Sequence, residues 1–132
     1  MIGGKVLDST AVLAIAAGTS DYTDALMVVA NQLGITLAVP TTAFQTAWQV
    51  VAARDGPWLE QLPAASMIVM LDLDTATARE AGQMAAHAGR PAAHLAAAHA
   101  AQIGVTRGWP VVTRSPQTLL ELSRDVITET IP

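Results

Sequence analysis

Residues able to do chemistry stand at three points where the sequence predicts that a strand ends. Asp8 follows a short apolar segment, Asp72 follows a longer one, and residues 113–115 (Thr-Arg-Ser) follow a third. In an open parallel sheet, ligands bind beyond the carboxyl ends of the strands. A carboxylate such as Asp8 can meet a metal ion or a phosphate there. It can equally serve as the N-cap of a helix, and Ser9 and Thr10 favour a helix start at this point.

Other titratable residues are weaker candidates. Asp72 and Asp74 are expected to form a turn and the start of a helix. His94 and His99 are five positions apart, about 140° around a helix axis, which is too far for both to bind one metal ion. His87 and His94 could lie on neighbouring helices, but surface positions or satisfied hydrogen bonds are expected for the histidines. The sequence has no cysteine, glycine-rich phosphate loop, zinc-ligand spacing or Gly-x-Ser-x-Gly turn.

Five apolar segments bounded by turn residues predict the strands that would position these side chains: residues 5–7, 35–39, 67–71, 111–113 and 126–131, the last at a sheet edge. Helices are predicted at residues 9–17, 21–33, 41–52, 74–87, 91–103 and 116–122, with a helical turn at 58–62, and Gly18, Gly34, Gly89 and Gly104 as stops. Strands that alternate with helices and are apolar on both faces predict a parallel sheet covered on both sides. We expect one domain over residues 1–132, a three-layer α/β/α sandwich around a mainly parallel five-stranded sheet.

Composition supports a folded domain. The chain has 132 residues, of which 52% are hydrophobic and only 4% aromatic, so its core must be built mainly from aliphatic side chains. No apolar run approaches the roughly 20 residues that cross a bilayer, and no basic segment precedes an apolar stretch at the start. With cysteine absent as well, we expect a cytoplasmic protein that has no contact with membranes.

The charge of the chain argues against nucleic-acid binding. The net charge is −4, with one lysine and six arginines, whereas phosphate contacts from a basic face supply most of the affinity of nucleic-acid binders. Arg90, Arg107 and Arg114 could form a small patch, although unrelated surface positions are the simpler expectation. RNA binding is therefore not indicated.

Four segments together resemble one protein family. Residues 6–14 (VLDSTAVLA), 39–45 (VPTTAFQ), 92–98 (AAHLAAA) and 108–115 (GWPVVTRS) occur in the order of matching segments in PIN-domain proteins, especially the VapC-type toxins of bacterial toxin–antitoxin pairs. They correspond to the first strand and helix, the second strand with its helix, the late helix that carries the third acid, and the fourth strand with its Thr-x-acid motif. The resemblance spans nearly the whole chain and depends on order and spacing, because no single segment is specific.

The resemblance implies a metal-dependent endoribonuclease. Such proteins gather three or four acidic residues at the carboxyl end of the sheet to hold Mg²⁺ or Mn²⁺. These hard ions require near-octahedral oxygen coordination and lose water reluctantly, so several negative ligands are needed to retain them. The metal then activates water and neutralises charge on the scissile phosphate.

Most of the implied acids are missing from this chain. The first is present as Asp8, and the second, usually Glu, falls on the neutral Gln45. The third, usually Asp, falls on Ala92 or one of the next two residues, and the fourth, usually Asp or Asn, falls on Ser115. No Asp or Glu occurs between positions 80 and 121. We therefore expect a degenerate site in which Asp8 is at best a weak metal ligand, with no Mg²⁺ or Mn²⁺ cofactor and no ribonuclease activity.

Three functions remain open. The first is a PIN-like protein that acts through protein association, and the resemblance implies a homodimer and an antitoxin-like partner. The second is an active Mg²⁺- or Mn²⁺-dependent endoribonuclease, the toxin of a toxin–antitoxin pair, with Asp8, Asp72, Ser115 and waters as unusual ligands. The third is a receiver-like signalling domain, since Asp8, Asp72 and Thr113 end successive strands. Two helices between the third and fourth strands and the lack of a lysine after the fifth argue against it.

Exposed apolar side chains would support the first function. Trp48, Trp58, Met27 and Met84 lie on predicted helices and are candidate anchors for a partner. Each can also belong to the core. An apolar patch that the fold leaves uncovered would mark a protein–protein contact.

Overall fold

The computed structural model describes residues 3–90 and 94–132, and a five-stranded sheet lies at its centre. Its strands are β1 (Gly4–Leu7), β2 (Thr36–Pro40), β3 (Ile68–Leu71), β4 (Val111–Thr113) and β5 (Thr128–Thr130). They are ordered β3-β2-β1-β4-β5, and every neighbouring pair is parallel. Val6 on the central strand is in register with Ala38 on one side and Val111 on the other. The carboxyl ends of β1, β2 and β4 therefore meet along one edge of the sheet.

Seven α-helices and two short 3-10 helices connect the strands within the described residues. They are α1 (Ser9–Ala17), α2 (Asp21–Leu33), α3 (Thr41–Val50), η1 (Ala53–Asp55), α4 (Gly56–Gln61), η2 (Leu62–Ala64), α5 (Thr75–His87), α6 (Leu95–Arg107) and α7 (Pro116–Leu122). Asp8, Ser20 and Asp74 begin α1, α2 and α5, because each side chain accepts a backbone N–H of the first turn. Gly18 and Gly34, both left-handed, end α1 and α2 as predicted.

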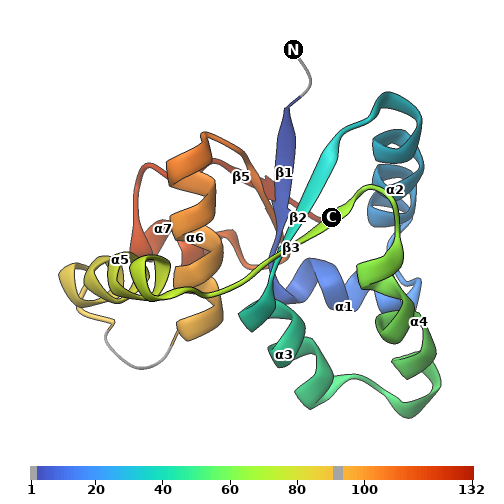
Figure 1. Cartoon of the computed structure of the whole chain (residues 1–132), viewed down its shortest axis with the longest axis horizontal. Helices are drawn as coiled ribbons and strands as arrows, with labels where there is room; N and C mark the ends of the chain where they lie inside the picture. Colours follow the sequence, from blue (N-terminus) through green and yellow to red (C-terminus); the bar gives the residue numbers. More distant parts are fainter. Residues whose placement is uncertain (1–2, 91–93) are drawn as a thin grey trace.

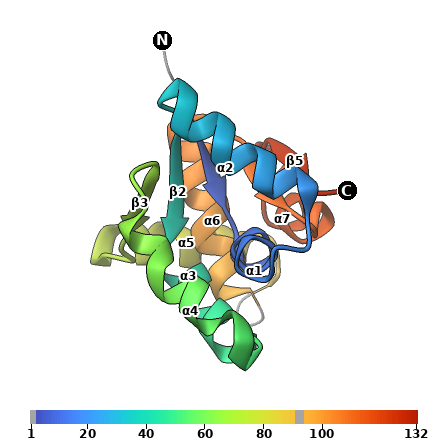
Figure 2. The ribbon, with the colours of Figure 1, turned by 90° about the vertical axis from the view of Figure 1, so that its right-hand side faces the viewer.

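The helices form two layers around the sheet. In Figure 1, α5, α6 and α7 lie to the left of the strands, while α1, α2 and α4 lie to the right. Figure 2 looks onto the second group and shows α1, α2 and α4 in front of the strands with α5 and α6 behind them. The helix α3 lies beyond the end of β2, where it contacts both α1 and α6. This α/β/α architecture confirms the predicted fold class, and the sheet is parallel throughout.

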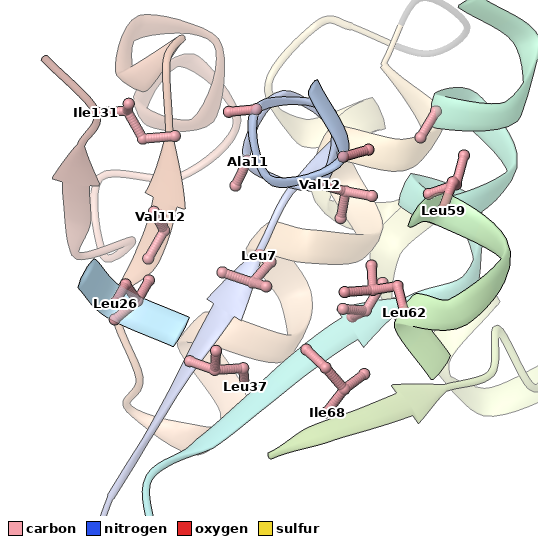
Figure 3. Close-up of a cluster of buried hydrophobic side chains, with 14 of the residues drawn as sticks. Leu7, Ala11, Val12, Leu26, Leu37, Leu59, Leu62, Ile68, Val112 and Ile131 are labelled. Carbon is pink, nitrogen blue, oxygen red and sulfur yellow. The ribbon is translucent and has the colours of Figure 1, made fainter. Parts of the chain in front are cut away.

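The two faces of the sheet pack against cores of different composition. On the face of α1 and α4, large side chains such as Leu7, Leu37 and Leu59 are fully buried (Figure 3), and each contributes about 2 kcal/mol by leaving water. On the opposite face, Val6 and Val111 pack against a layer in which α5 and α6 contribute mostly alanine. Small side chains let α6 lie close to the sheet.

The late helix extends beyond its predicted C-terminal end. It is predicted over residues 91–103 with Gly104 as its stop, and the predicted start lies outside the described residues. The helix α6 (Leu95–Arg107) continues through Gly104. Gly108, with φ of 68°, is the left-handed cap. Gly104 serves another purpose: a Cβ there would come within 2.8 Å of the Val111 side chain. It therefore allows α6 to approach β4.

The edges of the sheet agree with the sequence only in part. β5 is an edge strand as predicted, but it covers residues 128–130 rather than 126–131. β3 forms the other edge and is only partly buried, with Val69 44% exposed, although its sequence is apolar throughout.

Among the described residues no single helix is long and apolar enough to cross a membrane. Only α1 and α2 taken together meet that criterion, and they bend by 94°.

Candidate functional site

Asp8 lies at the carboxyl end of β1 and is the N-cap of α1. Its Oδ1 accepts a hydrogen bond from the Ala11 N–H at 3.0 Å and another from the Thr10 hydroxyl at 2.6 Å. The residue is only 7% exposed. One carboxylate oxygen is therefore committed to the start of the helix, which is the structural role that the sequence allowed.

Hydroxyl groups link the ends of β1 and β4 beside this carboxylate. The Thr10 hydroxyl accepts the Arg114 N–H at 2.8 Å and lies 3.5 Å from the hydroxyl of the buried Thr113. Thr113 in turn accepts the Ser115 N–H at 2.8 Å. The turn after β4 is thus fixed against the start of α1, and the polar groups in it satisfy one another.

A cavity of about 350 Å³ opens beside Asp8. We call it the Asp8 pocket; its lining combines apolar residues of α6 and α7 with seven polar residues, which are Asp8, Ser9, Thr10, Thr46, His94, Ser115 and Thr118. Among the described residues Asp8 is the one carboxylate that lines it. The structure therefore brings together two of the predicted positions, Asp8 and Ser115.

Gln45 lines a different cavity. Its side chain is exposed and borders a pocket of about 380 Å³ between α3, α5 and α6. The two cavities adjoin, because Thr46 and His94 line both of them. The residue of α3 that reaches the Asp8 pocket is thus Thr46, one position after the predicted one. Ala92, the predicted position of the third acid, lies outside the described residues.

The donors present do not suit a divalent ion. Within the described part of the chain, no group of three or more His, Asp or Glu side chains is placed to hold a metal. The Asp8 pocket offers one carboxylate, neutral hydroxyls and His94, whereas Mg²⁺ requires an octahedral shell of hard oxygen ligands with enough negative charge to replace water. The site therefore does not fit the metal that the resemblance implied.

Asp72 does not join Asp8. It follows β3, which is separated from β1 by β2, and it lines a third cavity together with Asp74 and His99. Neither the alternative ligand set of Asp8, Asp72 and Ser115 nor the receiver-like trio that includes Asp72 is brought together at one pocket.

His99 is a residue whose surroundings the sequence did not reveal. It is fully buried, its Nδ1 lies 2.7 Å from the Thr42 hydroxyl, and its Nε2 has no partner among the described residues. Burial lowers the pKa of His99, while the carboxylates of Asp74 and Asp72 act in the opposite direction. The expectation of a surface or fully satisfied histidine was wrong for this residue. His94, expected within the same helix, is instead the N-cap residue of α6.

The three arginines of the suggested basic patch line no common pocket. Arg90 borders the cavity beside Gln45 and pairs with Glu121 at 3.3 Å. Arg107 borders the cavity of Asp72 and lies 5.1 Å from the Trp109 ring centroid. Arg90 and Arg107 therefore border different cavities.

Solved structures of similar fold come from DNA-bound complexes. A chain of VapBC2 from Rickettsia felis, bound to a promoter DNA fragment, matches with a TM-score of 0.70 and 11% identity over 98% of this chain and 99% of that chain. A chain of DNA-bound VapBC from Salmonella typhimurium gives 0.71 and 18%, covering 98% of both chains. A chain of FitAB bound to an IR36 DNA fragment gives 0.60 and 17%, covering 96% and 94%. No family model and no curated protein matches the sequence. These likenesses confirm the predicted PIN-like fold.

Proposed function

We propose that this chain is a relative of the VapC-type toxins that no longer cleaves RNA by a metal-dependent route and acts instead by binding protein partners. The observation that carries the proposal is the lining of the Asp8 pocket. One carboxylate remains there, and its Oδ1 is engaged by the first turn of α1.

Electrostatics explain why this composition disfavours catalysis. A doubly charged ion gives up hydration only when several negative ligands replace it. The hydroxyls of Thr10, Thr46 and Ser115 are neutral, and their oxygens compensate little of that loss. Without the ion, neither the attacking water nor the charge on a phosphate is stabilised.

An active nuclease is the second candidate, because Asp8 and Ser115 do share a pocket. In that case waters must complete the shell of any bound ion, and affinity must be weak. Incubation of the wild-type protein with RNA and Mn²⁺ separates the two candidates. We expect no cleavage above that of the Asp8→Asn variant; Mn²⁺-dependent cleavage that Asp8→Asn abolishes would refute the inactive reading.

Restoration of the acids tests whether the pocket has been assigned correctly. The variant Thr46→Glu/Ala92→Asp/Ser115→Asp should bind Mn²⁺, and at 100 times the dissociation constant the melting temperature should rise by about 10 °C. A matched variant carries Gln45→Glu in place of Thr46→Glu. Because Gln45 borders the adjoining cavity, Mn²⁺ should raise the melting temperature of this matched variant by less. No gain with either variant would discredit the assignment of these positions.

Association with protein is supported by apolar side chains that the fold leaves uncovered. Trp58 is 65% exposed, Val50 64% and Trp48 39%, on the consecutive helices α3 and α4. Met27 and Met84, by contrast, pack against the two cores. We propose that exposed apolar side chains of α3 and α4 (Trp48, Val50, Trp58) take part in a homodimer or in binding of a small antitoxin-like protein, as in the VapBC and FitAB pairs of similar fold.

Light scattering with size exclusion tests the homodimer. Trp58→Glu should shift the protein from dimer to monomer, because a charge on a desolvated apolar contact is unfavourable. Leu33→Glu, on the exposed side of α2 where Leu33 is 61% exposed, is the matched control and should leave the mass unchanged. A monomeric wild-type protein would remove the homodimer from the proposal and leave the partner protein to be tested by co-purification.

A further inference from the structure

The two edges of the sheet differ in how they are protected from the addition of another strand. The edge strand β5 carries Glu129, whose carboxylate pairs with Lys5 at 2.6 Å. The edge strand β3 has the sequence IVML, and neither a charged residue nor a proline occurs between positions 64 and 71. Natural sheets block unwanted strand pairing with charges, prolines or bulges on their edges. Because β3 carries neither charges nor prolines, its edge is open to an added strand.

The register with β2 shows which backbone groups of β3 point outward. Leu37 on β2 is in register with Ile68, and its N–H donates to the Met67 carbonyl oxygen at 2.8 Å. Backbone groups of successive residues in a strand point to opposite sides, so those of Ile68 and Met70 point away from β2. The Ile68 N–H is bonded to the Ala65 carbonyl oxygen at 3.0 Å. Met70 therefore presents an N–H and a C=O without a strand partner.

Exposed apolar side chains accompany these backbone groups. Val69 is 44% exposed, and Leu73, just after the strand, is 40% exposed. In the described structure β3 packs mainly against β2 and the preceding η2, and it is the last strand on its side of the sheet (Figure 2). An added strand pairs its backbone with such an edge and packs alternate side chains against its residues. The outer side of β3 offers both kinds of contact.

The carboxyl end of β3 supplies negative charge. Asp72 and Asp74 follow the strand, are exposed, and line the same cavity as Arg107. Neither carboxylate forms an ion pair with a described residue, and Arg107 lies instead over the Trp109 ring. A strand added along β3 would pass these two carboxylates. Charge complementarity therefore favours a lysine or an arginine at that end of the added strand.

A second copy of this chain does not meet that requirement. Antiparallel pairing of β3 with itself about Met70 places Asp72 opposite Ile68 of the second copy. No charged residue occurs between positions 61 and 71 to meet the carboxylate there. The net charge of the chain, −4, also opposes self-association and attracts a basic partner.

We propose that the outer side of β3 binds an extended segment of another protein as an additional strand. Apolar residues of that segment lie beside Val69, and a lysine or an arginine lies beside Asp72 and Asp74. This inference rests on the proposed function, because it assigns a second surface and a chemistry to a protein partner. It does not depend on the exposed side chains of α3 and α4, so either surface can fail without the other.

Hydrogen exchange of backbone amides, followed by NMR on the intact chain, tests the added strand. The probe is the peptide acetyl-KVTVTVK-amide, whose symmetric sequence presents a lysine to the carboxylates in either direction. Saturating peptide should slow exchange of the Met70 N–H by about tenfold, because that group gains an acceptor. The Val69 N–H faces β2 and should change much less. A peptide with glutamate in place of both lysines should bind more weakly.

Variants of the protein test the two contacts separately. Asp72→Asn should weaken peptide binding by about threefold, as expected for one exposed ion pair. Asp24→Asn, which removes an exposed carboxylate from α2, is the matched control and should leave binding unchanged. Val69→Lys places a positive charge in the middle of the edge and should abolish binding of the basic peptide.

The proposal is overturned if the peptide leaves exchange of the Met70 N–H unchanged, if the glutamate peptide protects it equally, or if Asp24→Asn weakens binding as much as Asp72→Asn. Protection of the Met70 N–H in the free protein that disappears on dilution would show that a second copy occupies the edge, and would also overturn it. None of these results depends on the mass of the Trp58→Glu variant or on RNA cleavage, so failure here is distinguishable from failure of the proposed function.

Discussion

The Asp8 pocket and the cavity lined by Asp72, Asp74 and His99 lie along the same edge of the sheet, and α6 lines both. Their polar groups differ in whether they find hydrogen-bond partners. Around Asp8 a single carboxylate and neighbouring hydroxyls hydrogen-bond one another and fix the local backbone. Around His99 two exposed carboxylates line the cavity, while the buried imidazole nitrogen Nε2 has no partner in the described structure. Polar groups that satisfy one another stabilise the fold, whereas a buried polar group without a partner lowers stability.

We expect the largest loss of stability from a substitution that prevents the close approach of α6 to the sheet, because both pockets depend on that approach. Gly104→Leu forces a Cβ within 2.8 Å of the Val111 side chain and 3.1 Å of the Trp109 carbonyl oxygen. We expect a loss of about 3 kcal/mol in the free energy of unfolding, measured by urea denaturation. Gly82→Leu in α5 is the control, because a Cβ there meets nothing within 4 Å. Equal losses at both glycines would show that the approach of α6 is not tight.

We expect the Asp8 side chain to stabilise the fold as a hydrogen-bond acceptor rather than through its negative charge. Asp8→Ala removes the acceptor of both the Ala11 N–H and the Thr10 hydroxyl, and we expect about 2 kcal/mol of destabilisation. Asp8→Asn keeps a capping oxygen and should cost much less. Asp74→Ala, at the exposed cap of α5, should cost about 1 kcal/mol. If Asp8→Asn destabilises as much as Asp8→Ala, the charge itself is required and the contrast between the pockets fails.

His99 should make stability depend on pH. Burial lowers its pKa below the ordinary value of 6.5, so the unfolded chain takes up a proton at a higher pH than the folded one. The contribution of the neutral His99 side chain to the free energy of unfolding is complete above about pH 6.5. It declines as the pH falls below that value, by at most about 1.4 kcal/mol per pH unit. Denaturation of wild-type and His99→Gln proteins between pH 7 and pH 5 checks this. The lowered pKa of Asp74 changes the pH dependence of stability only near pH 4 and below. A wild-type slope that His99→Gln leaves unchanged would contradict the assignment.

Most of the fold follows from local pattern. Apolar runs between glycine or proline predicted strands close to the observed ones, and Asp8 and Asp74 predicted helix starts because their caps need only neighbouring residues. The C-terminal end of α6 did not follow, because the role of Gly104 depends on how closely α6 packs against β4, and local sequence pattern does not determine that packing.

The site was less predictable for the same reason. Which of Gln45 and Thr46 reaches Asp8 depends on the rotation of α3, and one residue changes the cavity that it lines. The burial of His99 depends on Thr42 from a separate helix. The spacing of residues in the sequence predicts neither the rotation of α3 nor the burial of His99, because both depend on tertiary packing.

Melting of the wild-type protein in sub-millimolar Mn²⁺, beside Asp8→Asn, tests the central claim most directly. If one carboxylate cannot retain a divalent ion, the melting temperature of both proteins should stay within about 1 °C of the metal-free value, because an unbound ion gives no stabilisation. A rise of several degrees in the wild type that disappears in Asp8→Asn would show that the pocket holds the metal after all.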